Sequence, residues 1–142
     1  MEDVVALLIY HGSTLDFQKE NARKMTEALK KRNMFADVYY SFMNVNKPSI
    51  REALREIARK GHRKVVAIPV FLSEGAHTVH DIPKELGVQG REKEEIVDVD
   101  GIKLKVIYAS TIGFDERIAD ILIERGREAV NKAENAKNRK EE

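Results

Sequence analysis

The chain alternates between short, nearly continuous apolar runs and longer segments whose apolar residues recur at helical spacing. The apolar runs fall at residues 4–10, 36–43 and 64–72. Runs of this length without strict alternation are typical of strands that are buried on both faces, as in a parallel sheet. We therefore predict three strands at these positions.

Helical periodicity separates the predicted strands. The clearest amphipathic pattern has apolar residues at i, i+3, i+4, i+7 and i+8 between residues 50 and 58, and Gly61 follows as a C-terminal stop. A weaker apolar stripe predicts another helix between the first two strands. We expect Ser13 or Thr14 to cap the N-terminus of that earlier helix.

The second half of the chain is less regular. Residues 73–87 are predicted to form a loop with at most one turn of helix, and residues 94–110 a hairpin that turns at Asp100 and Gly101 and leads into a fourth strand. Asp115 is expected to cap a last helix. The apolar residues expected on or near the inner face of that helix are Ile118, Ile121, Leu122 and Ile123.

The order of these elements predicts the fold class. Strands that alternate with helices indicate a single-domain α/β fold with a mainly parallel four-stranded sheet, helices on both faces and a flavodoxin-like winding. We expect the domain to occupy residues 1–130. Residues 131–142 are expected to form a charged tail, either a helical extension or a frayed end.

The amino-acid composition excludes several kinds of site and partner. The 142 residues include no cysteine, which excludes disulfides, thiolate nucleophiles and cysteine-based zinc or iron–sulfur sites. The net charge of +1 gives no sign of a nucleic-acid groove or an acidic-membrane patch. No apolar run is long enough to span a bilayer, and acidic residues stand near the N-terminus where a signal peptide has positive charge. We therefore predict a cytoplasmic protein without nucleic-acid or membrane partners.

Two histidines stand beyond the ends of predicted strands. His11 lies at the carboxyl end of the first strand, and His77 a few residues past the third. Open α/β sheets bind ligands outside the carboxyl ends of their strands, so the two imidazoles share a crevice if those strands are neighbours. Two neutral imidazoles can bind Fe, Co, Ni, Cu or Zn. A histidine at a strand end can equally be a hydrogen-bonded turn residue, and both interpretations stay open.

The other two histidines are weaker candidates. His80 follows His77 by three residues, so it could share a face with His77 if that loop turns helically, but we expect it in solvent. His62 comes directly after Gly61 at a helix end. We expect it at the opposite edge of the sheet in a structural or solvated role.

Four motifs together resemble a known family. They are "HGS" at residues 11–13, "NKPSI" at 46–50, "PVFLSEGAHTVHDIP" at 69–83 and "IG" at 112–113. In this order and spacing they resemble the short archaeal sirohydrochlorin cobaltochelatases, which belong to the class II tetrapyrrole chelatases. The resemblance covers about residues 3–125, nearly the whole predicted fold.

The resemblance implies that the protein inserts a divalent metal ion into sirohydrochlorin, a reduced tetrapyrrole with eight carboxylate groups. It assigns metal binding and catalysis to His11 and His77. Co²⁺ is the favoured metal, with Ni²⁺ or Fe²⁺ also possible; it is a substrate, and no tightly bound cofactor is expected. The resemblance also implies a homodimer with the active site between subunits. The residues expected to contact the substrate are Gly12, Ser13, Asn44, Ser49, Gly75, Ala76 and Thr78.

This sequence departs from the family at two places. Asn44 stands where many relatives carry a glutamate that can complete the metal site, although Asn44 keeps an amide oxygen and Glu74 lies at the same predicted edge. "STIG" at residues 110–113 replaces the usual "EPIG" and is expected to alter loop shape. Candidate cations for the substrate carboxylates are Lys47, Arg51 and Arg91, although an ordinary surface role is the expectation for each. Candidates to pack on the ring face are Phe71, Leu72, Ala76 and Val79.

Other functions stay open from the sequence. One is a non-catalytic metal or tetrapyrrole carrier, which the Asn44 departure keeps in view, and another is a sirohydrochlorin ferrochelatase. A remote third is a phosphohistidine-type phosphatase, because "YHG" is close to the "RHG" of that class. Phosphoryl transfer needs a cationic clamp, and Tyr10 stands where the arginine would be.

Overall fold

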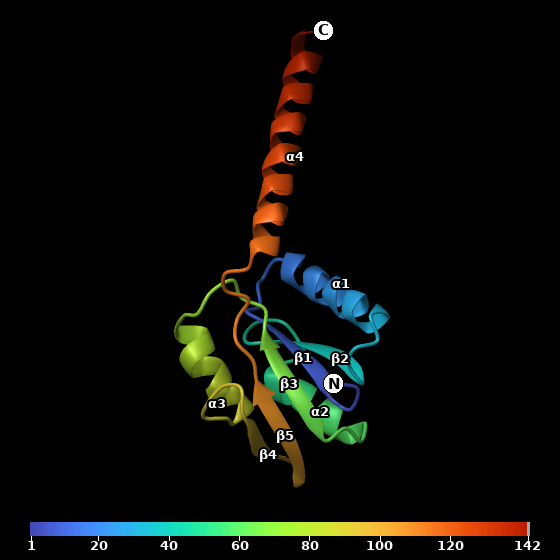
Figure 1. The fold of residues 1–142 in the computed structure, drawn as a ribbon, viewed down its shortest axis with the longest axis vertical. Helices are drawn as coiled ribbons and strands as arrows, with labels where there is room; N and C mark the ends of the chain where they lie inside the picture. The colour runs from blue at the N-terminus through green and yellow to red at the C-terminus, as the bar shows by residue number, and fades with distance from the viewer. Residues whose placement is uncertain (142) are drawn as a thin grey trace.

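The computed structural model describes residues 1–141, with side chains described as far as Lys140. Five strands form one sheet in the order β2-β1-β3-β5-β4 (Figure 1). The strands are β1 (Val5–Tyr10), β2 (Asp37–Phe42), β3 (Lys64–Pro69), β4 (Glu94–Val99) and β5 (Ile102–Tyr108). The helices are α1 (Phe17–Lys31), α2 (Ile50–Arg59), α3 (Ile82–Leu86) and α4 (Glu116–Glu141), with a π-helical segment (His77–Asp81) directly before α3.

The predicted α/β class is confirmed, with one more strand than expected. β1 pairs in parallel with both β2 and β3, and β3 pairs in parallel with β5. β4 pairs antiparallel with β5, so both arms of the predicted hairpin join the sheet. The hairpin turns at Asp100 and Gly101, both with positive φ, as the sequence predicted.

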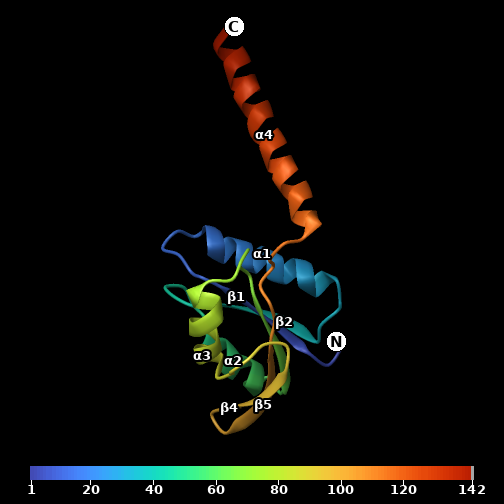
Figure 2. The same ribbon diagram turned by 60° about the vertical axis from the view of Figure 1, so that its left-hand side comes forward.

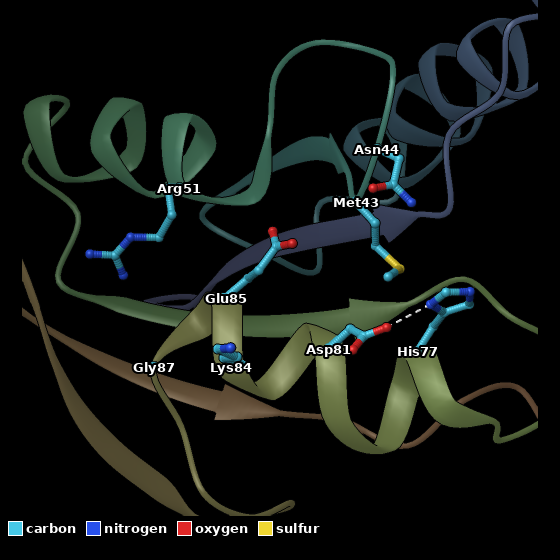
Figure 3. A pocket seen from close by; sticks show the side chains of 8 residues that line it. All are labelled: Met43, Asn44, Arg51, His77, Asp81, Lys84, Glu85 and Gly87. Carbon is cyan, nitrogen blue, oxygen red and sulfur yellow. Dashed lines mark hydrogen bonds and ion pairs between the residues drawn. The ribbon is translucent and has the colours of Figure 1, made fainter.

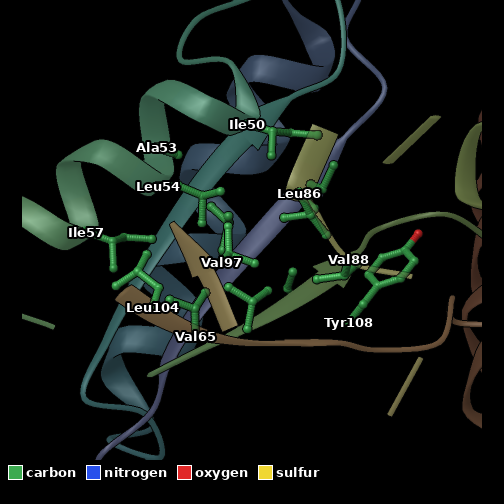
Figure 4. Close-up of a cluster of buried hydrophobic side chains, with 14 of the residues drawn as sticks. Ile50, Ala53, Leu54, Ile57, Val65, Leu86, Val88, Val97, Leu104 and Tyr108 are labelled. Atoms are coloured by element: carbon green, nitrogen blue, oxygen red, sulfur yellow. The ribbon is translucent and has the colours of Figure 1, made fainter. Parts of the chain in front are cut away.

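The apolar run of β1 is continuous because helices cover both faces of the strand. Its alternate side chains enter two separate clusters. Val5, Leu7 and Ile9 face α2 and α3, in the larger cluster drawn in Figure 4. The remaining β1 side chains, Ala6, Leu8 and Tyr10, face α1 on the other side. Figures 1 and 2 show α1 and the α2–α3 pair on opposite sides of the sheet.

The first two helices begin in different ways. Ser49 accepts a hydrogen bond from the Glu52 backbone N–H, and the Glu52 side chain accepts one from the Ser49 backbone N–H, which forms a complete capping box for α2. The expectation that Ser13 or Thr14 caps α1 is wrong. The cap position of α1 is Asp16, which makes no side-chain capping hydrogen bond, and the Ser13 hydroxyl accepts from the Leu15 N–H within the preceding loop.

Residues 73–87 are more helical than their sequence indicates. The predicted loop contains the π-helical segment and α3, and it ends at Gly87 with a φ of 85°. Ile82 and Leu86 are fully buried one turn apart. The helical conformation is therefore stabilised by tertiary burial of this face, which sequence periodicity over so short a stretch did not reveal.

α4 runs away from the sheet, beyond the edge where β1, β3 and β5 end (Figures 1 and 2). Asp115 caps it by accepting from the Arg117 N–H at 2.9 Å, as predicted. The predicted inner face is wrong, because Leu122 and Ile123 are 65% and 58% exposed. Residues of the predicted tail continue this helix as far as residue 141. Within residues 1–141, no helix combines the length and apolar character that crossing a membrane requires.

Candidate active site

The pairing of β1 with β3 brings His11 and His77 together. His11 directly follows β1, and His77 opens the helical segment that comes a few residues after β3. Because these strands are parallel neighbours, their carboxyl ends lie at one edge of the sheet. The centroids of the two imidazole rings are 4.9 Å apart, and the ring planes are inclined by 66°. The convergence that the sequence predicted is therefore present in the fold.

Hydrogen bonds orient both imidazoles. The Nδ1 atom of His77 lies 2.8 Å from Oδ2 of Asp81, one helical turn later. The Nδ1 atom of His11 lies 2.9 Å from the carbonyl oxygen of Gly12. Both partners are acceptors, so Nδ1 is the protonated nitrogen in the neutral form of each ring. This tautomer leaves the Nε2 lone pair of each ring available for a metal ion.

Few other ligands surround the histidine pair. Among the residues that the structure describes, no group of three or more histidine, cysteine, aspartate or glutamate side chains is arranged to hold a metal ion. A closed four-ligand site retains its metal, whereas a pair of imidazoles leaves coordination positions open. The arrangement therefore suits an ion that is bound and then passed on.

Gly12 allows the first two loops at this edge to pack closely. Its φ is +99°, and a Cβ atom at this position would lie 2.0 Å from the carbonyl oxygen of Asn44. The Asn44 N–H donates to the carbonyl oxygen of His11 at 3.1 Å, and the Ser13 N–H donates to the Asn46 side chain at 2.8 Å. Only glycine fits here without strain, and the close approach places Asn44 beside the histidines.

A hollow of about 810 Å³ opens on one side of the histidine pair (Figure 3). Both signs of charge line it, and α3 contributes several of the side chains. The lining residues are Met43, Asn44, Arg51, His77, Asp81, Lys84, Glu85 and Gly87. Burial, followed by the charge of Asp81, raises the pKa of Glu85.

Five of the lining residues, three of them charged, are not among the candidates from the sequence. Asp81, Lys84 and Glu85 follow His77 at i+4, i+7 and i+8, which is the spacing of one helical face. The sequence predicts a loop over residues 73–87, so this spacing has no meaning until the segment is seen to be helical. The helical signal was present in the positions of the polar side chains rather than in a long apolar stripe.

A second hollow of about 500 Å³ lies on the His11 side, and it is mainly apolar. Phe71, a predicted ring-packing residue, has its ring centroid 6.4 Å from that of His11. The lining residues are Tyr10, His11, Phe17, Gln18, Asn21, Val70, Phe71, Leu72 and Ile112. Since His77 lines the first hollow and His11 the second, the imidazole pair lies between a charged space and an apolar one.

An ion pair supports the segment that carries His77. Arg91 contacts both carboxylate oxygens of Glu74, and its Nη2 donates to the carbonyl oxygen of Thr78 at 3.0 Å. Tyr108 donates to the same carbonyl at 2.7 Å, and the Arg91 guanidinium lies 4.4 Å from the centre of the Tyr108 ring. The hydrogen bonds from Arg91 lower the pKa of Glu74, and burial raises the pKa of Tyr108 to about 12. Glu74 and Arg91 therefore hold the loop in place through their own contacts.

Some predicted substrate-contacting residues have structural contacts of their own. The Ser49 hydroxyl caps α2, and the Thr78 side chain is buried, where its hydroxyl donates to Glu74 and accepts from the Gly75 N–H. Gly75 and Ala76 are exposed directly before His77. Their contacts with a substrate stay predictions.

The remaining candidate cations and histidines lie at different places in the fold. Lys47 forms an ion pair with Glu52 at 3.1 Å, whereas Arg51 lines the charged hollow. His80 is exposed, as expected. His62 lies at the start of β3, the opposite edge of the sheet, where its ring packs edge-on to Tyr39 with centroids 6.3 Å apart. The metal-site candidates therefore reduce to His11 and His77.

Fold and site together define an α/β protein with a pair of histidines at the carboxyl edge of a mainly parallel sheet. The chain belongs to the CbiX family, whose model matches residues 5–129. It is 36% identical over 126 residues to the sirohydrochlorin cobaltochelatase of Saccharolobus islandicus, an alignment that covers 89% of this chain and 95% of that one. It is 34% identical to the sirohydrochlorin cobaltochelatase of Methanopyrus kandleri, with 89% and 97% covered.

Solved structures show the same fold. The sirohydrochlorin chelatase SirB from Bacillus subtilis subspecies spizizenii, in complex with cobalt, has a TM-score of 0.71 at 20% identity. That comparison covers 90% of this chain but 51% of SirB, so the chain spans about half of that protein. A CbiX protein from Marinobacter aquaeolei VT8 has a TM-score of 0.64 at 18% identity, with 91% of this chain and 98% of the other covered.

Proposed function

We propose that this protein is a sirohydrochlorin chelatase that inserts a divalent metal ion, with Co²⁺ favoured, into sirohydrochlorin. The observation that carries the proposal is the 4.9 Å approach of the His11 and His77 rings at the open edge of a CbiX-family fold. The two archaeal relatives named sirohydrochlorin cobaltochelatase support it, because each aligns over nearly its whole length.

In the proposed reaction the two imidazoles hold the incoming ion. Insertion replaces two pyrrole N–H protons of the ring with one divalent ion, so the ion must exchange protein ligands for ring nitrogens. The Nε2 atoms of His11 and His77 provide two ligands and leave the other positions open. Asp81 keeps the His77 ring in the orientation and tautomer that presents Nε2.

The two hollows would divide recognition of the macrocycle between them. Arg51 and Lys84 in the charged hollow are suited to the substrate's carboxylate groups. Phe71, Leu72 and Ile112 in the other hollow offer an apolar surface to the ring face. Asn44 takes the place of the family glutamate beside His77 and contributes an amide oxygen. This division would orient the ring nitrogens toward the space between the two histidines.

Metal identity, assembly and location belong to the same proposal. Imidazole affinity follows a general metal order, so Co²⁺, Ni²⁺ and Fe²⁺ all remain candidate substrates. We propose a homodimer in the cytoplasm as the working form. The chain's match to about half of SirB supports two copies acting together.

The test is anaerobic mixing of the purified protein with sirohydrochlorin and Co²⁺, followed by the absorbance change of the ring. We expect insertion well above the rate without protein, and single-turnover competition among Co²⁺, Ni²⁺ and Fe²⁺ then ranks the metals. A carrier would bind the ring without accelerating insertion, and this outcome would overturn the proposal. A preference for Fe²⁺ would instead identify a ferrochelatase.

The phosphatase alternative receives no support from the site. The Tyr10 side chain lies in the cluster beneath α1, where its hydroxyl donates to Oδ1 of Asn21 at 2.9 Å. The position that would carry the cationic clamp therefore supplies no charge beside His11. Hydrolysis of a phosphohistidine substrate by the purified protein would contradict this conclusion.

A further inference from the structure

The turn that begins at His77 is π-helical. The N–H of Ile82 donates to the carbonyl oxygen of His77, five residues earlier, and so closes a wider turn than that of an α-helix. Pro83 follows directly. Inside an α-helix, a proline ring collides with the carbonyl group four residues earlier and supplies no N–H. Pro83 therefore disfavours a continuous α-helix through this segment.

The carbonyl group of Thr78 loses its usual helical partners in this turn. It would accept from the N–H of residue 82 in an α-helix and from the N–H of residue 83 in a π-helix. Ile82 donates to His77 instead, and Pro83 has no N–H. Thr78 is buried, and a buried carbonyl group without a donor is destabilising. The position therefore needs a donor from elsewhere in the chain.

Two side chains from outside the helix supply donors at this position. The hydroxyl of Tyr108, at the end of β5, donates to the Thr78 carbonyl at 2.7 Å. Nη2 of Arg91, in the loop between α3 and β4, donates to the same oxygen at 3.0 Å. The Arg91 guanidinium also lies over the Tyr108 ring, which holds the two donors together. The Thr78 carbonyl is thus bound to two segments that lie far along the chain.

Glu74 holds the beginning of the same segment. Its carboxylate accepts from Arg91, from the Thr78 hydroxyl at 2.7 Å and from the backbone N–H of Thr111. The hydrogen bonds from Arg91 keep the pKa of Glu74 below its usual value, so the carboxylate stays charged near neutral pH. Residues on both sides of His77 are therefore fixed, while the His77 ring itself is free to face the histidine site.

We propose that Arg91 and Tyr108 replace the missing helical donor at Thr78 and, through Thr78, position His77 for metal binding. Thr78 directly follows His77, so a fixed carbonyl at Thr78 fixes the backbone from which the imidazole projects. The same turn carries Asp81, whose Oδ2 lies 2.8 Å from Nδ1 of His77 (Figure 3). A turn that loses these donors changes its hydrogen-bond register and moves Asp81 relative to the ring.

Arg91 and Tyr108 are in this view positioning residues, because they act through His77. Their role rests on the proposed function, in which His77 is a metal ligand. A site with two protein ligands depends strongly on how well its supporting contacts hold those ligands in place. The network around Thr78 supplies that support on the His77 side of the pair.

Titration of the purified protein with Co²⁺, without sirohydrochlorin, tests the role of Arg91. Arg91→Gln is expected to bind Co²⁺ at least tenfold more weakly, because glutamine is uncharged and too short to bridge Glu74 and Thr78. Arg55→Gln is the matched control. Arg55 pairs with Asp100 at 3.2 Å in the hairpin turn, at the opposite end of β5 from Tyr108, so its loss should leave the affinity unchanged.

Equal Co²⁺ affinity in Arg91→Gln and the unsubstituted chain would overturn the proposal. An unsubstituted chain that bound no Co²⁺ would do the same, since Arg91 would then have no metal ligand to position.

A double variant separates positioning from general destabilisation. If Arg91 acts through the His77–Asp81 pair, Asp81→Asn removes part of what Arg91→Gln has already disturbed. The loss of Co²⁺ affinity in the Asp81→Asn/Arg91→Gln variant should therefore be smaller than the product of the two single losses. Single losses that multiply would show that Arg91 acts independently of the pair, which contradicts the proposed role.

Urea unfolding tests the replacement of donors at Thr78. Tyr108→Phe removes one hydrogen bond to the Thr78 carbonyl, and Pro83→Ala gives residue 83 an N–H. We expect the shift of the unfolding midpoint caused by Tyr108→Phe to fall by at least half in the Pro83→Ala background, because the helix can then supply a donor. An equal shift in both backgrounds would show that Tyr108 does not replace a helical donor.

The absorbance assay with sirohydrochlorin distinguishes failure of this proposal from failure of the proposed function. If Arg91→Gln binds and inserts Co²⁺ as the unsubstituted chain does, the positioning role fails and the chelatase stands. If the unsubstituted chain binds Co²⁺ but does not insert it, while Arg91→Gln binds Co²⁺ weakly, the chelatase fails and the positioning role stands.

Discussion

The imidazole rings of His11 and His77 lie with their centroids 4.9 Å apart, and each Nδ1 is already engaged by an acceptor. The two residues come from separate loops that meet because β1 and β3 are parallel neighbours. The geometry of this pair is the basis for the first two predictions.

Replacing either histidine with alanine is expected to lower metal insertion by more than about 100-fold, because each removes one of two protein ligands. Neither ring is part of the buried core, so the unfolding midpoint should change little. The measurement is the initial rate of the absorbance change with sirohydrochlorin and Co²⁺, alongside thermal unfolding followed by circular dichroism.

His62→Ala and His80→Ala are the matched controls for these variants. His62 lies at the opposite edge of the sheet and His80 is exposed, so both should retain the insertion rate. A strong loss of activity in His62→Ala, with His11→Ala still active, would show that the site lies at the opposite edge of the sheet from the one proposed.

Asp81→Asn is expected to weaken metal binding by about 10–100-fold, because the amide no longer holds the His77 ring as the charged carboxylate does. The effect should appear as a higher KM for Co²⁺ with a smaller change in the KM for sirohydrochlorin. Asp98→Asn makes the same chemical change in a surface carboxylate of β4 that pairs with Lys103, and it should leave both values unchanged. Equal metal affinity in Asp81→Asn and the unsubstituted chain would remove Asp81 from the site.

Gly12→Ala is expected to destabilise the fold by about 2–4 kcal/mol, because alanine disfavours the positive φ and its Cβ would collide with the Asn44 carbonyl. Urea unfolding measures this change. The control is Gly75→Ala, since no atom lies within 4 Å of a Cβ at that position and its φ is not in the positive region. Similar unfolding midpoints for the two variants would contradict the close packing at Gly12.

Tyr108→Phe is expected to show a pH-dependent difference from the unsubstituted chain. At pH 8 the variant loses the buried hydrogen bond to Thr78 and about 1–2 kcal/mol of stability. Burial raises the pKa of Tyr108 from 10.0 to about 12, so the unfolded chain releases this proton first as the pH rises. The tyrosine protein should therefore lose about 2–3 kcal/mol between pH 10 and 12 that the variant keeps.

Urea unfolding from pH 8 to pH 12 measures this difference. The gap in the free energy of unfolding between the two proteins should shrink above pH 10 and then reverse. Burial also raises the pKa of Tyr10 to about 12, but Tyr10 is present in both proteins, so its contribution cancels in the difference between their free energies of unfolding. A gap that stays constant over this range would show that the Tyr108 hydroxyl is not desolvated in solution.

Much of the fold was predictable because local patterns and tertiary burial agree. The uninterrupted apolar run of β1 required helices on both sides, and α2 had both a full amphipathic stripe and a capping box. His11 and His77 could be selected because carboxyl strand ends share an edge in a parallel sheet. The helical state of residues 77–86 was not predicted, because it depends on the tertiary burial of Ile82 and Leu86 and its only local signal is the spacing of polar side chains.

By itself, the sequence determined the alternation of strands and helices, the two histidines and the family resemblance, since these depend on residue types and their local spacing. The tertiary structure alone decided that Asp81 orients His77, that Glu74 and Arg91 support the loop instead of serving as free ligands, and that α4 leaves its own sheet uncovered. The Glu74–Arg91 contact joins residues 17 apart, and the His77–Asp81 contact spans a helical turn that the sequence did not predict. An apolar stripe indicates that one side of a helix packs against another surface. Which surface it meets depends on where the fold of the whole chain positions that helix.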